Sequence, residues 1–242
     1  MGLFDRLMGG SSDKKASPAA KWADRMERRA QNYDRQEAIT ALSDMGTPEA
    51  VELLLKRFTF HMDPSITDQE EKDAAFQGVL RAGTAAIEPI RAFAARAESL
   101  AWPMKIAREL LEEPEFVEEL LRWLARWDTE YSKFVDPKVQ ILTALEEHKG
   151  GAIREGVERF LEDVNEPSRF HAVNAVFAQD DVAALPALLK LLVEEESVRV
   201  RTKIVEGLAA QGWEISADQR QGVSRAMPAG YTIDAKGHVA KR

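Results

Sequence analysis

The stretch VRVRTKIVEGLAAQG, from Val198 to Gly212, decides the fold because its spacing returns elsewhere in the chain. Within it a basic residue, Arg201, is followed three positions later by Ile204, then by the pair Gly207-Leu208 and a final glycine. Apolar residues three and four positions apart lie on one face of a helix. The stretch therefore predicts an amphipathic helix that ends at a glycine.

The same spacing recurs along the chain, which predicts an internal repeat. Four other copies begin at basic lead residues, namely Arg35, Lys72, Lys138 and Arg169. In chain order the five lead residues are 37, 66, 31 and 32 positions apart, and a weaker copy around Ala107 fills the double gap. Each copy is followed by a second apolar-patterned segment, such as PEAVELLLKRF from Pro48. One helix pair cannot cover its apolar face, whereas stacked pairs bury a continuous core, so we expect six pairs.

The sequence thus predicts an all-α fold, an α-solenoid of about six helical hairpins over residues 21–227. Residues 1–8 are expected to form a short amphipathic segment, and residues 9–20, rich in Gly, Ser, Lys and Pro, a flexible linker. In residues 228–242 the apolar residues no longer follow helical spacing but alternate, as at Tyr231 and Ile233, so we expect a C-terminal tail or a small hairpin.

These residues resemble the HEAT-repeat family, in particular the short bacterial repeats similar to phycobilisome-lyase repeats. The resemblance is carried by Arg35, Ala38, Ala41-Leu42 and Gly46 followed by Pro48-Glu49-Ala50-Val51, and again by Arg201, Gly207-Leu208 and Gly212. It covers about residues 33–227. It implies that the small and aliphatic positions serve helix packing, and it indicates an architecture rather than an activity. We expect the basic lead residues to pair with neighbouring acids or to bridge adjacent repeats.

The composition narrows the functional classes. The 242 residues include no cysteine, which excludes disulfides and thiolate chemistry and fits a reducing compartment, so a bacterial cytoplasm is expected. The net charge of −8 disfavours a nucleic-acid partner. The sequence has no apolar run of 18 or more residues and no recognisable secretion signal, so we expect no membrane span.

No catalytic residue, cofactor or metal is expected, although the resemblance suggests three enzyme classes. They are a phycobilin lyase or isomerase, a di-iron hydroxylase and a DNA glycosylase. The four histidines lack the pairing with Glu or with a second histidine that an iron site needs. Trp123, Trp127 and Asp128 would suit a glycosylase, but the surrounding segment is strongly acidic and would repel DNA. An enzyme or cofactor-handling protein on this scaffold is kept as the alternative.

The function expected first is a non-enzymatic protein–protein adaptor or scaffold, because solenoids expose a long surface that holds other proteins. The candidate protein-binding residues are four aromatic side chains, Trp123, Trp127, Tyr131 and Phe134. The same aromatic residues could instead fill the core between repeats. A long loop from Phe58 to Asp68 is a second candidate. The acidic run Glu194-Glu195-Glu196 is interpreted as a solvated face or a helix end rather than an acid-base pair.

The N-terminal segment offers a separate docking element. Leu3, Phe4, Leu7 and Met8 fall on one side of a short helix. Such a segment suits a partner's groove or weak contact with a membrane surface, so a peripheral membrane adaptor is a further alternative. A disordered terminus is the competing interpretation.

Overall fold

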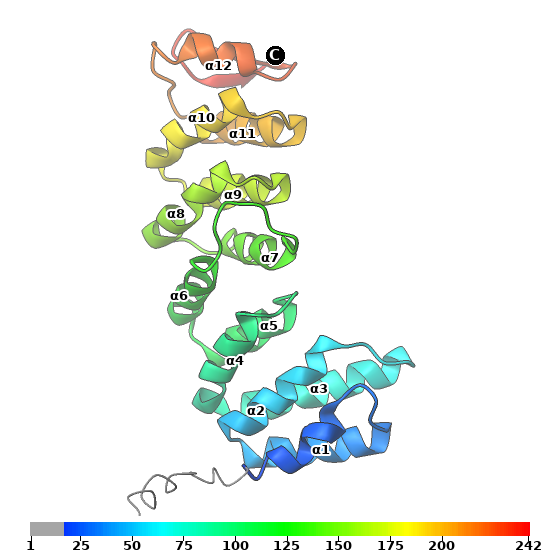
Figure 1. Ribbon diagram of the computed structural model, residues 1–242. Coiled ribbons are helices and arrows are strands. Elements are labelled where there is room, and N and C mark those ends of the chain that lie inside the picture. The colour runs from blue at the N-terminus through cyan, green and yellow to red at the C-terminus, as the bar shows by residue number, and fades with distance from the viewer. Residues whose placement is uncertain (1–16) are drawn as a thin grey trace, which may run out of the picture. The chain divides into compact units, whose positions relative to one another are not determined.

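The computed structural model describes residues 17–242, which fold into a mostly helical protein with one short β-hairpin (Figure 1). Contacts divide the described residues into two compact units, the first ending at Ile90 and the second running from Arg91 to Arg242. The division falls inside helix α4, Ile87–Ala94. Within residues 17–242 no helix is both long and apolar enough to cross a membrane.

The first unit is built around three α-helices. They are α1, Asn32–Met45, α2, Pro48–Leu55, and α3, Ser65–Arg81. Three short 3-10 turns lie before α1, after α2 and after α3, at Ala20–Met26, Lys56–Thr59 and Gly83–Ala86 respectively. Helices α1 and α3 lie against each other, and α2 packs on both. Because α3 begins at Ser65, the expected loop from Phe58 to Asp68 is shorter than the sequence suggested, and Asp68 is helical.

The second unit consists of successive helices up to the C-terminal hairpin. The α-helices are α5, Ala101–Leu110, α6, Glu113–Leu124, α7, Asp136–Leu145, α8, Gly151–Glu158, α9, Glu166–Ala178, α10, Leu185–Glu194, α11, Val198–Gln211, and α12, Arg220–Ala226. The 3-10 turn η4, Arg159–Glu162, extends α8, and η5, Val182–Ala184, precedes α10. Proline at the first turn of α6, α7, α9 and α10 fits a position where the backbone N–H has no helical acceptor.

Helices of the second unit stack in two rows. Helix α9 contacts α7 on one side and α11 on the other, while α10 contacts η4 and α12. Figure 1 shows α7, α9 and α11 in one row and α6, α8 and α10 in the other. Buried aliphatic residues of the repeat pattern, among them Ile141, Ala172 and Ile204, form the core between them.

The glycines of the repeat pattern have two physical roles. Gly46 and Gly212 end α1 and α11 in the left-handed conformation, with φ of 59° and 63°, which glycine adopts without a steric penalty. Gly78 and Gly207 lie inside helices at close contacts. A Cβ added to Gly78 would lie 2.0 Å from Ser43 Oγ, and one added to Gly207 would lie 2.3 Å from the Phe177 ring. Small residues therefore let neighbouring first helices approach each other.

The chain ends in a two-stranded antiparallel hairpin. Strand β1, Tyr231–Ile233, pairs with β2, Val239–Lys241, and Thr232 lies opposite Ala240. Strand β2 packs on α11, and β1 contacts α12. The Arg220 side chain holds the turn by donating to the carbonyl oxygens of Ala235 and Lys236.

Candidate functional site

An open groove of about 980 Å³ lies in the second unit between α8–η4 and α10. Its sides come from the second helices of two consecutive helix pairs, and the segment leading into α9 closes its base. The buried apolar side chains of Leu161 and Leu191 form part of the floor, with Ala187 beside them. Seven acidic and four basic side chains also line the groove, so its surface is mostly charged.

Two ion pairs that involve the basic lead residues support the base of the groove, one fully buried and one partly buried. Lys138 Nζ lies 2.5 Å from Asp163 Oδ2, and both side chains are fully buried. The same ammonium group donates to the carbonyl oxygen of Asp128 and lies 5.8 Å from the centre of the Phe160 ring. Asp163 Oδ1 accepts from the backbone N–H of Asn165, at the start of α9. Lys138 thereby ties its own repeat to the loop that begins the next one.

Arg169 and Glu195 repeat this arrangement one helix pair further along. Arg169 donates from Nε and Nη2 to the two carboxylate oxygens of Glu195, both at 2.7 Å. Glu195 in turn accepts from the backbone N–H of Ser197, the N-cap residue of α11. Burial by itself would raise the pKa of the Glu195 carboxyl, but the hydrogen bonds from Arg169 and Ser197 outweigh it and lower the pKa.

The prediction that lead residues pair with nearby acids is confirmed for four of the five positions. In the first unit Arg35 binds Glu71 through two hydrogen bonds, and Lys72 binds Asp68 at 2.7 Å. Arg201 differs, because it forms no ion pair within the described residues and its buried Nε lacks a hydrogen-bond partner there. Arg201 lies in the last helix pair, α11 and α12, after which the chain continues into the hairpin.

The buried network of the first unit adds a residue that sequence reasoning did not identify. Arg57 is fully buried and donates to Glu71 at 2.6 Å and to Asp68 at 2.7 Å. Burial by itself would raise the pKa of the Asp68 carboxyl, but hydrogen bonds from Lys72 and Arg57 hold it well below its usual value. Because its groups already satisfy one another, this network joins α1, α3 and the 3-10 turn Lys56–Thr59 after α2 rather than forming an open site.

The aromatic candidates do not form one patch. Trp123 is 4% exposed, so it belongs to the core of its helix pair, which agrees with the alternative that these aromatic residues fill the core. It lies on the face of α6 that also buries Phe116 and Leu120, and burial of an indole there removes apolar area from water. Trp127 is half-buried in the turn after α6, whereas Tyr131 is 77% and Phe134 46% exposed.

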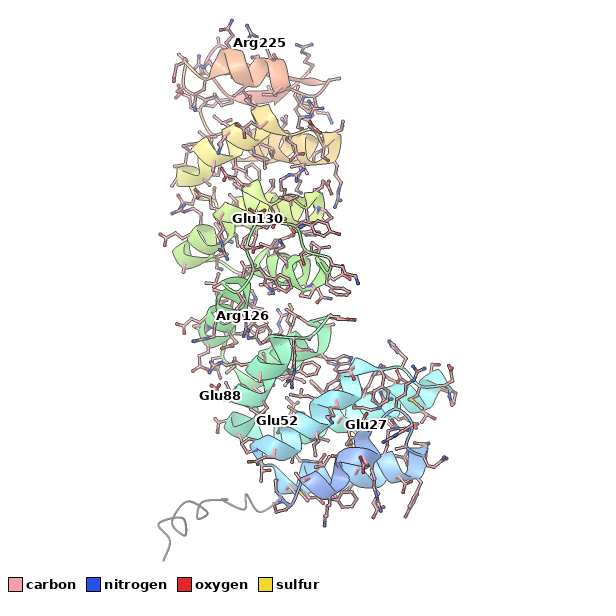
Figure 2. All side chains as sticks on the ribbon, in the orientation of Figure 1. Glu27, Glu52, Glu88, Arg126, Glu130 and Arg225 are labelled. Carbon is pink, nitrogen blue, oxygen red and sulfur yellow. The ribbon has the colours of Figure 1, made fainter. Side chains whose placement is uncertain are left out.

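The loop that carries these aromatic residues reaches the groove. The carbonyl oxygen of Thr129 accepts a hydrogen bond from the backbone N–H of Val164, and Arg159 donates to the carbonyl oxygen of Trp127 at 2.7 Å. Val164 and Arg159 both line the groove. Figure 2 labels Glu130 on this loop, at the level of α9. Exposed Tyr131 and Phe134 thus belong to a loop anchored at the rim of the groove.

A smaller groove of about 310 Å³ lies on the other side of α10, between α10 and α12. Lys190 and Glu194 line both grooves, and the half-exposed Val193 lies in the smaller one. The exposed edge of α10 therefore separates two adjacent hollows. Leu3, Phe4, Leu7 and Met8, the candidate docking residues of the N-terminus, lie outside the described residues.

Sequence reasoning missed the groove itself and the partners of the lead residues. Asp163-Val164-Asn165 and Glu195-Glu196-Ser197 share a local pattern, an acid two positions before the polar residue that begins a first helix. That pattern could have identified the two acids. Glu194-Glu195-Glu196 lies at the end of α10, one of the two interpretations, but it is not uniformly solvated, because Glu195 is buried while its two neighbours are exposed. In residues 17–242 no group of three or more histidine or acidic side chains is placed to hold a metal ion.

Comparison with known proteins identifies the repeat. Residues 34–59, which span most of α1 and all of α2, match the family described as PBS lyase HEAT-like repeat. The resemblance inferred from the spacing at Arg35 is therefore confirmed. Neither a curated protein nor a solved structure matches the chain.

Proposed function

Since the chain carries a HEAT-like repeat, we propose that it is a non-enzymatic scaffold whose helix pairs continue as one α-solenoid of six units and bind another protein. The match at residues 34–59 and the recurrence of the same spacing up to Gly212 support the repeat architecture. Adaptors of this kind bind partners along the surface made by their second helices. A cytoplasmic location is part of the proposal and rests on the absence of cysteine from the sequence.

The observation that carries the binding function is the groove between α8–η4 and α10, with an aromatic loop at its rim. Its volume of about 980 Å³ is at the top of the range for small-molecule pockets, and it is open to solvent along the helices. Tyr131 and Phe134 are exposed on the loop that the Thr129–Val164 hydrogen bond anchors to the groove. Aromatic side chains are frequent anchors of protein interfaces because they give large contact area at low entropic cost.

Filling the groove tests this function. Ala187→Trp places an indole in the groove, whereas Ala183→Trp adds the same side chain at an exposed position of η5 that does not line it. Affinity capture from native lysate, followed by mass spectrometry, should recover the same partner with wild-type protein and with Ala183→Trp, and lose it with Ala187→Trp. Recovery of that partner by Ala187→Trp at the wild-type level would show that the groove is not the binding surface.

A further inference from the structure

The charges of the groove indicate which kind of segment it binds. Acidic side chains line both of its walls. Glu158 and Glu162 come from the α8–η4 wall, and Glu194 and Glu196 come from the end of α10 and the turn after it. The seven acids outnumber the four basic side chains of the lining, so the groove as a whole carries negative charge.

The basic side chains of the lining are already engaged. Arg169 is bound to Glu195 through two hydrogen bonds. Arg159 donates to the carbonyl oxygens of Leu124 and Trp127, and Arg154 lies 2.6 Å from Glu158 and 2.7 Å from Asp181. Lys190 forms an ion pair with Glu162. A ligand carboxylate or phosphate would have to displace these contacts in order to pair with a cation of the groove.

Acidic side chains, in contrast, remain available. Glu194 and Glu196 are exposed and form no ion pair within the described part of the chain. Glu155 is 73% exposed and lies 3.5 Å from Arg154, a distance at which an exposed pair contributes little. Below these charges lie the apolar side chains of Leu161, Leu191 and Ala187. The groove thus offers negative walls above a partly apolar floor.

We propose that the groove between α8–η4 and α10 binds a basic segment of a partner protein, with arginine or lysine facing the wall acids and an apolar side chain on the floor. This inference rests on the scaffold function proposed above. Charge complementarity of this kind steers encounter and selects partners, and it disfavours acidic segments and nucleic acid at the same site. The exposed ring of Tyr131, on the loop anchored to the groove through Thr129, suits the guanidinium groups of arginine, which stack on aromatic faces.

Fluorescence anisotropy with the full chain tests the proposal. The probe is a short fluorescein-labelled peptide of arginine and leucine in a glycine–serine background, and a second peptide has glutamate in place of arginine. We expect the arginine peptide to bind, the glutamate peptide not to bind, and added salt to weaken binding because exposed charges are screened. Equal binding of the two peptides would overturn the proposal.

A pair of matched variants distinguishes the effect of the groove charges on peptide binding from the effect of the protein's net charge. Glu194→Gln/Glu196→Gln removes two charges from the groove, and Glu115→Gln/Glu118→Gln removes two exposed charges from α6, outside the groove. We expect the groove variant to weaken binding by about threefold to thirtyfold and the α6 variant by less than about twofold. Equal effects would mean that the peptide responds only to net charge, which overturns the proposal.

Failure of the basic-segment proposal can also be distinguished from failure of the scaffold function. If the arginine peptide does not bind while Ala187→Trp still abolishes capture of the native partner, the groove binds a protein of different chemistry and only the basic occupant is wrong. If Ala187→Trp affects neither peptide binding nor partner capture, both proposals fail.

Discussion

Replacing Asp163 by asparagine should destabilise the second unit more than any surface substitution of the same charge change. The amide introduced by Asp163→Asn would keep the oxygen that accepts from Asn165, but the buried Lys138 ammonium would lose its anionic partner. Leaving one buried charge uncompensated costs about 3–5 kcal/mol. For a unit of this size, each kcal/mol lowers Tm by about 2–4 °C, so a decrease of roughly 6–20 °C is expected.

The neighbouring Glu162 supplies the matched control. Glu162→Gln also removes one negative charge from η4, but its ion pair with Lys190 is exposed, with side-chain exposures of 67% and 57%. Such a pair contributes about 0–1 kcal/mol. The free energies of unfolding are compared by urea titration monitored by circular dichroism.

The double variant Lys138→Met/Asp163→Asn removes both charges and should recover most of the lost stability, since replacing a buried ion pair by apolar groups is often neutral. The reasoning is refuted if Asp163→Asn costs no more than Glu162→Gln, or if the double variant is as unstable as the single one.

Three further outcomes are expected. Trp123→Ala should lower stability by about 3–5 kcal/mol because its indole is 4% exposed, whereas Tyr131→Ala should stay within about 0.5 kcal/mol in the same urea titration. Gly78→Val should destabilise the first unit by about 1–3 kcal/mol because its Cβ would overlap Ser43, while Gly222→Ala on α12, where nothing lies within 4 Å, should be neutral or stabilising. The pKa of Asp68 is lowered in the folded protein, so its contribution to the free energy of unfolding is complete above the unfolded pKa of about 4. That contribution is lost as the pH falls through the folded pKa. Acid titration followed by circular dichroism should therefore show a steeper pH dependence of unfolding for wild type than for Asp68→Asn.

The HEAT-like repeat could be recognised from the sequence because its signals are local. The spacing from Arg35 to Gly46 sets one helical face and its glycine end, and both reappear in α1 as the structure has it. Gly207 likewise follows from packing, because a helix that must approach a neighbour closely needs a small residue there. The helical face and the glycine end depend on residues within one helix, and the small residue recurs at a fixed place in each copy, so periodicity and glycine placement are enough to find them.

The candidate site was less predictable because it depends on segments that are distant in the chain. Trp123 and Tyr131 are both aromatic and lie close together in sequence, yet the packing of α6 buries one, and the loop after it leaves the other exposed. Similarly, nothing in the run Glu194-Glu195-Glu196 tells which carboxylate turns inward toward Arg169.

The sequence by itself therefore determined the helical repeat, the positions of its glycine ends and the need of its basic lead residues for partners. Only the tertiary structure decided which acids pair with these lead residues and which aromatic residues stay exposed. It also decided that an open groove lies between α8–η4 and α10. The physical reason is that helical periodicity is set by neighbours three and four positions apart. The groove instead requires two helix pairs to be placed side by side, and the buried ion pair joins Lys138 to Asp163, 25 positions away in the chain.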